Sequence, residues 1–320
     1  MTDSAEKQLI KYLADAHAVE EQALAQLRAA PKIAGDERLA AAFEQHLEET
    51  EGHERGVRAR LEAHDADPST FKDLAGRAGG WGMVLFARSQ PDTPGKLTAH
   101  AFSYEAMEYA TYELLRLAGE AAGDNDTAEV ASSIAVEESR MAERLAGLFD
   151  AAVEASLREL STDDVDHHLD HYLEDAHALE QQATQMLEAA PKLVEDEALI
   201  EAFRRHLGET EGHKQRLEQR LEARGASPSH IKDVALRAGA LNLGAFFGAQ
   251  PDTTPKLAGF AYAFENLELG GYELLRRVAE RAGDGTTAAM AVEIAAEERE
   301  AAAKVAATWE ATMRAAMSVA

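Results

Sequence analysis

The feature that most constrains this chain is an internal duplication that covers nearly all of its length. The segment Y-L-A-D-A-H-A-V-E-E-Q-A, from Tyr12, returns as Y-L-E-D-A-H-A-L-E-Q-Q-A, from Tyr172. A-A-P-K, Q-P-D-T and Y-E-L-L-R also return, always 160 residues later and without insertion or deletion. Self-similarity of this kind indicates two copies of one domain. We therefore predict domains at 1–160 and 161–320, with Ser161 as the N-cap of the second copy's first helix.

Within each copy the apolar residues recur with a helical period, and no strand pattern is seen. In the first copy we expect long helices over 4–29, 36–64, 96–122 and 127–157. The connections between them are short, long and short, which is the topology of ferritin-like bundles. The predicted fold class is all-α, with two tandem ferritin-like four-helix bundles that form an internal pseudo-dimer.

The long connection between the second and third helices carries apolar stretches. These are W-G-M-V-L-F, from Trp81, in the first copy and A-F-F-G, from Ala245, in the second. Packing of the two halves against each other is the preferred interpretation, and a substrate entry is the alternative. No fifth short helix is expected after either bundle, which argues against a cage-forming storage ferritin.

Composition excludes several classes of protein. The chain has no cysteine, so thiolate metal sites and disulfides are ruled out, and any metal must be held by His, Asp and Glu. The net charge is −26, with 58 acidic against 32 basic residues, which disfavours nucleic acid and anionic membranes as partners. The N-terminus lacks the order of a signal peptide, and no apolar run reaches the roughly 20 residues of a membrane span. We expect a cytoplasmic protein.

Polar residues interrupt the apolar stripe of every expected helix at a similar depth. Glu20 lies on the stripe of the first helix, and the stripe of the second includes H-L-E-E-T-E-G-H, residues 46–53. Glu105 and Glu108 lie on the third stripe, and either Glu137 or Glu138 lies on the fourth. Buried carboxylates that converge would repel one another, and a cation removes that penalty. Because residues three or four apart share a helix face, Glu49 and His53 can both serve one centre.

The second copy keeps this polar set while apolar neighbours change. Met107, for example, becomes Leu267, and Met141 becomes Ala301. The retained residues are His177, Glu180, His206, Glu209, His213, Glu265, Glu268, Glu297 and Glu298. A dinuclear carboxylate site explains the set better than a structural polar network does.

For single residues the plainer interpretation is preferred, since charged side chains mostly face solvent. Glu48, Glu51, Glu54 and Glu113 are expected at the surface, as is one member of the pair Glu137 and Glu138. His17 and His46 are interpreted as ligands, as hydrogen-bonding partners of ligands, or as core histidines paired with a carboxylate.

The residues resemble a known family at this point. A-V-E-E-Q in the first helix, H-L-E-E-T-E-G in the second, E-A-M-E-Y-A-T-Y in the third and E-E in the fourth are similar to the ferritin-like stress proteins typified by YciE and YciF. The resemblance covers nearly all of both halves except the long connection. It implies a four-helix bundle with a di-iron or related di-metal centre.

The resemblance also implies a ligand set, to which the spacing adds His53 as the best nitrogen donor. The predicted ligands are Glu20, Glu49, His53, Glu105, Glu108 and Glu138, with Glu180, Glu209, His213, Glu265, Glu268 and Glu298 in the second copy. Residues left open between ligand and supporting partner are His17, His46, Glu137, His177, His206 and Glu297. Glu49 with Glu105 or Glu138 would bridge the two metals, and Glu20 would bind one of them.

Two departures from the family pattern point to a carboxylate-rich centre. The third helix has E-A-M-E and E-N-L-E where the family tends to have Glu-His-Tyr-Glu, and Glu138 is followed by Met141 where a histidine would stand. Tyr104, Tyr109 and Tyr112 are expected in the core, with electron donation as the alternative. Only Tyr112 keeps a tyrosine in the second copy, at Tyr272.

Hard oxygen ligands with a few imidazoles suit iron or manganese, with zinc as a substitute. The leading prediction is two iron ions per bundle that react with O₂ or peroxide, in a ferroxidase-like role in iron handling or stress protection. The alternatives are a manganese-catalase-like enzyme and a non-enzymatic helical protein with a structural or vestigial metal site.

Overall fold

The computed structural model describes residues 3–68, 93–228 and 253–319, and within these ranges every regular element is a helix. The chain divides into two compact units, Met1–Ser156 with Met313–Ala320, and Leu157–Thr312. None of the described helices is both long enough and apolar enough to cross a bilayer. The apolar stretches from Trp81 and Ala245 lie outside the described residues.

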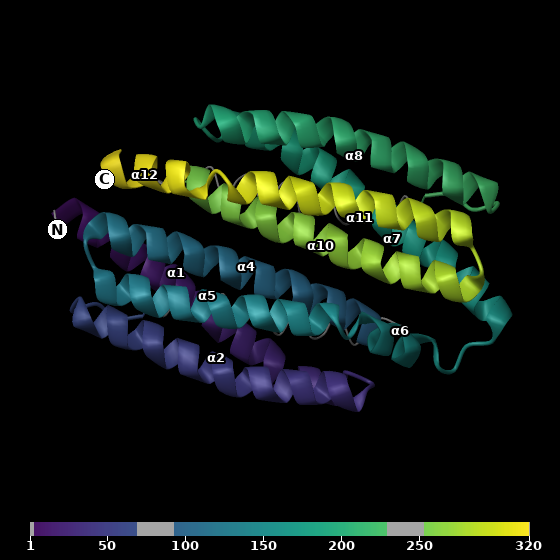
Figure 1. Cartoon of the computed structure of the whole chain (residues 1–320), viewed down its shortest axis with the longest axis horizontal. Coiled ribbons are helices and arrows are strands. Elements are labelled where there is room, and N and C mark those ends of the chain that lie inside the picture. Colours follow the sequence, from purple (N-terminus) through teal and green to yellow (C-terminus); the bar gives the residue numbers. More distant parts are fainter. Residues whose placement is uncertain (1–2, 69–92, 229–252, 320) are drawn as a thin grey trace. The chain divides into compact units, whose positions relative to one another are not determined.

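The helices of the first half pack around one interior. α1 packs on α2 and on α4, and α5 packs on α4 and on α2, so that the four lie lengthwise beside one another (Figure 1). The elements in chain order are α1 (Asp3–Leu27), the 3₁₀ turn η1 (Ala30–Lys32), α2 (Glu37–Ala63), α4 (Thr93–Ala122), α5 (Asn125–Ala146) and α6 (Phe149–Leu157).

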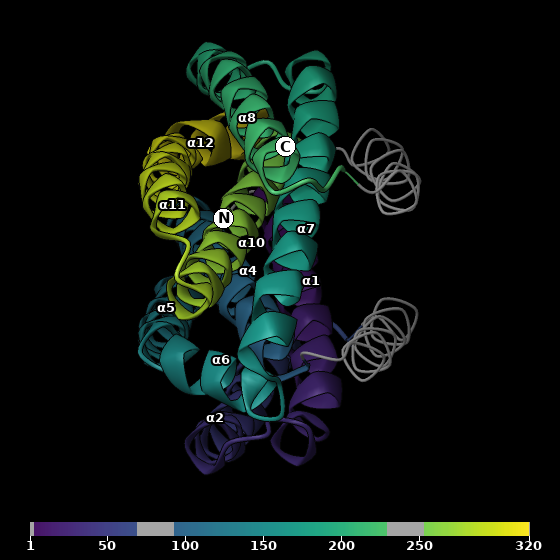
Figure 2. The same ribbon diagram turned by 90° about the vertical axis from the view of Figure 1, so that its right-hand side faces the viewer.

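The second half repeats this arrangement. α7 packs on α8 and α10, and α11 packs on α10 and α8; Figure 2 shows these helices from one end. The elements are α7 (Thr162–Ala189), η2 (Ala190–Lys192), α8 (Glu197–Ala223), α10 (Thr253–Ala282), α11 (Gly285–Ala306) and α12 (Trp309–Val319). The prediction of an all-helical chain with two similar halves is confirmed.

Side-chain caps fix where the helices begin. Asp36 accepts hydrogen bonds from the backbone N–H groups of Arg38 and Leu39 at the start of α2. The predicted cap at Ser161 is confirmed, because its hydroxyl and the Asp164 carboxylate form a reciprocal capping box. These bonds satisfy backbone donors that have no partner inside the helix.

The prediction of one uninterrupted helix over 127–157 is wrong, and so is the expectation that no short helix follows each bundle. The chain breaks after Ala146 and resumes as α6, and the second half breaks in the same way before α12. The break lets a large aromatic side chain enter the interior of each half. Phe149 packs against Phe102 with ring centroids 5.8 Å apart, and Trp309 packs against Tyr262 at 4.9 Å.

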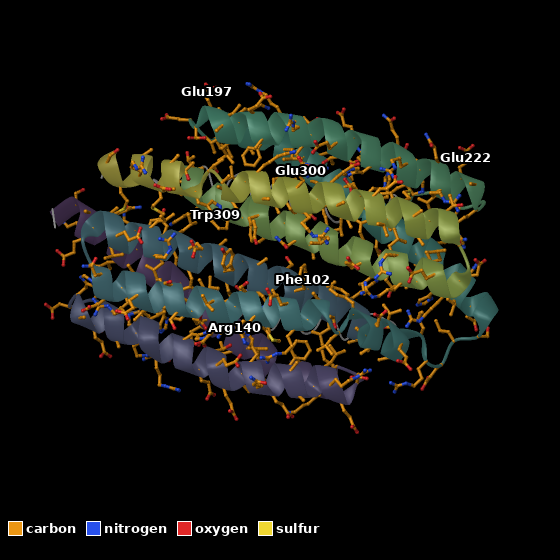
Figure 3. All side chains as sticks on the ribbon, viewed as in Figure 1. Phe102, Arg140, Glu197, Glu222, Glu300 and Trp309 are labelled. Atoms are coloured by element: carbon orange, nitrogen blue, oxygen red, sulfur yellow. The ribbon has the colours of Figure 1, made fainter. Side chains whose placement is uncertain are left out.

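Charged and apolar residues lie on opposite faces of each helix. The first half contains a buried apolar cluster that includes Leu39, Phe43, Leu97 and Leu145. Charged side chains cover the opposite faces; Figure 3 labels Glu197 and Glu222 near the two ends of α8, where both are exposed. Against this pattern, a set of glutamates and histidines lies inside each half.

Candidate metal centre

Four helices of the first half each bring at least one buried polar side chain to a common depth. α1 supplies Glu20, and α5 supplies Glu138, both with no exposed surface. α2 supplies His46 and His53, and α4 supplies Glu105 and Glu108, all at most 3% exposed. Helix geometry explains why these positions face the interior together, because residues three or seven apart lie on the same face of a helix.

One group of these side chains centres on His46. Its Nε2 atom lies 3.0 Å from Oε2 of Glu105 and 3.4 Å from Oε2 of Glu138. Glu108 completes the group, in which one ligand atom from each residue lies within 4.8 Å of every other. Three carboxylates and one imidazole are thus held together inside the helices.

A second group lies beside the first and contains Glu20, His53 and Glu138. Nδ1 of His53 lies 2.8 Å from Oε1 of Glu138 and 3.8 Å from Oε1 of Glu20. The hydroxyl of Tyr112 donates a hydrogen bond to Oε1 of Glu20. Glu138 belongs to both groups and offers a different oxygen to each histidine.

The outer nitrogen of each histidine contacts a glutamate that is partly exposed. Nδ1 of His46 lies 3.1 Å from Glu49, and Nε2 of His53 lies 2.8 Å from Glu137. These pairs fix the rotation of both rings, so that one nitrogen of each faces the interior. The same device orients metal-binding histidines generally.

The second half repeats the geometry. Nε2 of His206 lies 2.7 Å from Glu265 and 3.1 Å from Glu298, and Nδ1 of His213 lies 2.9 Å from Glu298. The outer nitrogens contact Glu209 at 3.1 Å and Glu297 at 2.5 Å. The hydroxyl of Tyr272 donates to Glu180. Two copies that differ in many neighbouring residues therefore keep one arrangement.

Many of the inward atoms are buried without a hydrogen-bond partner among the described residues. In the first half they are Oε2 of Glu20, Nε2 of His46, Nδ1 of His53, Oε2 of Glu105 and both carboxylate oxygens of Glu108 and of Glu138. Buried polar groups are almost always satisfied, and each exception needs an explanation. A bound cation would supply the missing partners, so these groups could hold a metal ion.

Crowding of carboxylates and imidazoles perturbs the pKa values of both groups in the first half. Burial is the main cause that raises the pKa of Glu20 to about 8 and that of Glu105 to about 7. Burial and the neighbouring carboxylates, Glu138 first among them, raise the pKa of Glu108 well above its ordinary value. Burial disfavours a charged His53, but the adjoining Glu138 carboxylate outweighs it and raises the pKa of His53 to about 9.

The second half shows the same opposition between burial and charge. Burial raises the pKa of Glu265 to about 7. For Glu298 burial acts in the same direction, but the adjoining His206 and His213 side chains outweigh it and lower its pKa to about 2. Without a cation, each cluster is held together by protons and by protonated histidines.

The structure places most of the predicted ligands in the two groups of each half. His46 and His206, which the sequence left open, belong to them, whereas Glu49 and Glu209 lie behind these histidines with side chains 27% and 31% exposed. Glu137 and Glu297 are also outside, at 40% and 44%. The sequence feature that could have assigned His46 to the site is its spacing from His53: seven residues are two helical turns, so the two histidines lie on the same face.

His17 lies apart from the two groups. Its Nε2 atom is 2.9 Å from Oε1 of Glu54, and His177 makes the corresponding contact with Glu218 at 3.2 Å. The expectation that Glu54 faces solvent is wrong, because it is 8% exposed and also paired with Arg58. Glu48 and Glu51 are exposed as expected.

A family model matches the chain twice, at residues 4–158 and 164–318, under the description "Domain of unknown function (DUF892)". The chain belongs to the DUF892 family. DUF892 is a family of the ferritin-like superfamily, and the two matches show that this chain carries two DUF892 domains in tandem. No solved structure matches the chain. The buried His and Glu groups described above occur once in each DUF892 domain.

Proposed function

We propose that each half of the chain is a ferritin-like four-helix bundle that binds two metal ions in its interior. The ligands of the first half are Glu20, His46, His53, Glu105, Glu108 and Glu138, and those of the second are Glu180, His206, His213, Glu265, Glu268 and Glu298. The supporting observation is the set of buried carboxylate and imidazole atoms without hydrogen-bond partners, repeated in both halves. We keep 1–160 and 161–320 as the domain bounds, paired as a pseudo-dimer.

The shared carboxylate is the central element of the proposal. Glu138 is the bridging ligand in the first half, because its two oxygens face His46 and His53 separately. Glu49 and Glu137 act on the outer nitrogens of these histidines and keep the inner nitrogens free for a metal. Tyr112 donates a hydrogen bond to Oε1 of Glu20 and leaves Oε2 of Glu20 available for a metal.

The mixture of carboxylates and imidazoles suits iron or manganese, and zinc would substitute for them. Bound iron or manganese would supply redox chemistry toward O₂ or peroxide. The surrounding helices contribute by excluding water, since the ligands are nearly free of exposed surface. We propose iron as the resident metal and a ferroxidase-like role in iron handling or stress protection.

Metal analysis of untagged protein tests this proposal. Cells supplemented with both iron and manganese should yield protein with about two ions per half. The paired variant Glu138→Gln with Glu298→Gln should lose most of the metal in both halves. Its matched control is Glu51→Gln with Glu211→Gln, since both are exposed glutamates, on α2 and α8, that belong to neither group of buried side chains.

The control should retain the full metal content. A protein without metal, or one whose metal content survives the loss of Glu138 and Glu298, would refute the proposal. Bound manganese, together with evolution of O₂ from peroxide, would instead identify a manganese-catalase-like enzyme.

A further inference from the structure

A small cavity lies beside the proposed metal ligands of the first half. Its volume is about 20 Å³, and Glu105 and Glu108 form part of its wall. Gln26, His100 and Tyr104 also line it, and the rest of the wall is mainly apolar. A space of this size holds one molecule about as large as water or hydrogen peroxide.

The polar atoms around this cavity are arranged to bind such a molecule. Nε2 of His100 lies 3.1 Å from Oε1 of Gln26, and this contact fixes the orientation of the Gln26 amide. The amide nitrogen of Gln26, Nε2, is buried and has no hydrogen-bond partner among the described residues. Burial lowers the pKa of His100 to about 4, so the histidine is neutral at pH 7.

The cavity also offers acceptors. Both carboxylate oxygens of Glu108 are buried without a partner. The hydroxyl of Tyr104 donates to the backbone oxygen of Val19 at 3.0 Å, which leaves the lone pairs of its own oxygen available. A guest with hydrogen-bond donors and acceptors can therefore bond to Gln26 at one end and to Glu108 or Tyr104 at the other.

The second half does not keep this polarity, although it keeps the metal ligands. Met186, Phe260 and Phe264 stand where the first half has Gln26, His100 and Tyr104. The two phenylalanine rings lie 6.3 Å apart. All three hydrogen-bonding side chains are thus replaced by apolar ones, while Glu265 and Glu268 remain.

We propose that the cavity of the first half is a binding position for hydrogen peroxide beside its metal centre, and that the second half has no equivalent. This inference rests on the proposed metal-binding function. It makes the two halves unequal: the first is specialised for a polar, hydrogen-bonding oxidant, whereas the second presents an apolar wall. Gln26 is the residue that distinguishes them most directly, because it lines the cavity and its amide nitrogen has no hydrogen-bond partner among the described residues, whereas the second half has Met186 at this position.

Two single-centre chains allow the halves to be compared within the full-length protein. Glu298→Gln leaves only the first-half centre intact, and Glu138→Gln leaves only the second. Both are loaded anaerobically with ferrous iron, and their oxidation is followed at a series of hydrogen peroxide concentrations. The half-saturating peroxide concentration of the first centre should be about tenfold lower, the effect of one or two hydrogen bonds.

Adding Gln26→Met to the Glu298→Gln chain should raise that concentration about tenfold and leave the iron content unchanged. Methionine has nearly the size of glutamine and is the natural residue of the second half, so folding is expected to persist. The rate with O₂, which is apolar, should not change. The reciprocal pair Met186→Gln with Phe264→Tyr, in the Glu138→Gln chain, should lower the half-saturating concentration.

A crystal structure supplies a readout that does not depend on turnover. Crystals of the Glu298→Gln chain soaked in hydrogen peroxide should show one ordered molecule within hydrogen-bond distance of Nε2 of Gln26. The Gln26→Met chain should show none. An empty cavity in the soaked crystal, or equal peroxide dependence in the two halves, would overturn the inference. Absence of iron from both single-centre chains would refute the proposed function, and the soaked crystal would still decide the cavity.

Discussion

Replacing Glu108 and Glu268 with methionine should change the stability of the metal-free and the metal-loaded protein in opposite directions. Each glutamate is 1% exposed, and both of its carboxylate oxygens lack a hydrogen-bond partner among the described residues. Leaving a buried polar group unsatisfied costs about 1–3 kcal/mol. Methionine fills a similar volume without a polar group, so the metal-free variant should gain about 1–3 kcal/mol for each half.

Metal reverses the order of the two proteins. Each ion that binds only the folded state adds about 2.7 kcal/mol when its concentration is 100 times its Kd, so two ions add about 5 kcal/mol to each half, more than the variant gains without metal. The parent chain should therefore gain stability when iron or manganese is added, whereas the double variant should gain much less. Urea unfolding of chelator-treated and metal-loaded protein, analysed by linear extrapolation, measures both effects. Because the chain has two units, each transition is fitted separately.

The decisive result is the metal-free comparison. A double variant that is less stable than the parent without metal would mean that Glu108 and Glu268 stabilise the fold through a polar network. The cluster would then be structural, and the interpretation of its unpartnered oxygens as metal ligands would fail. The matched control, Glu51→Met with Glu211→Met, should change the stability little, since both residues are exposed.

The remaining predictions concern single positions. Asp124→Asn should cost about 2–3 kcal/mol at pH 7, because Asp124 accepts hydrogen bonds from Arg60. Burial opposes it, but hydrogen bonds from Thr127, His64 and Arg60 outweigh it and lower the pKa of Asp124 well below the ordinary aspartate value. Its contribution is therefore present above the ordinary aspartate pKa and lost as pH falls below it toward the folded-state pKa. Urea unfolding from pH 7 to about pH 2 should show the variant and the parent converging below about pH 4. Gly35→Ala should destabilise by about 1–2 kcal/mol, because Gly35 has φ +68° and an added Cβ would lie 2.7 Å from Pro94. Gly52→Ala, inside H-L-E-E-T-E-G-H, should instead stabilise the folded protein by about 0.5–1 kcal/mol, since the added Cβ would meet only the end of Arg55 at 3.9 Å. The metal content should be unchanged, and a loss of metal would show that this glycine serves the site.

The sequence predicted the duplication and the inward polar set because both are periodic properties. A carboxylate on an apolar stripe, such as Glu20 or Glu138, is visible from spacing alone. Spacing could not reveal which nitrogen of His46 faces the interior, because that depends on the rotamer chosen with Glu49 three residues away. It also could not show that Glu54 is buried, since its partner His17 comes from another helix.

The helix break before Phe149 was missed for a related reason. The apolar period continues through residues 127–157. Gly147 at the C-cap of α5 is a local signal for an end, but the second half breaks at Ala307 without it. Phe149 packs against Phe102 on α4, so the reason for the break lies in tertiary contact. Long-range packing of this kind overrides a helical pattern.

His46 and His53 stand two turns apart on one helix, and their ring centroids are 6.3 Å apart in the first half, against 6.4 Å for the matching pair in the second. The backbone of α2 places the two residues about 10.5 Å apart along the helix axis. Their side-chain conformations, held by Glu49 and Glu137, bring the rings closer together. One residue inserted between the two histidines would rotate His53 by about 100° away from Glu138. The spacing of the two histidines therefore depends on an uninterrupted α2, and a change of length is tolerated by the centre only outside this helix.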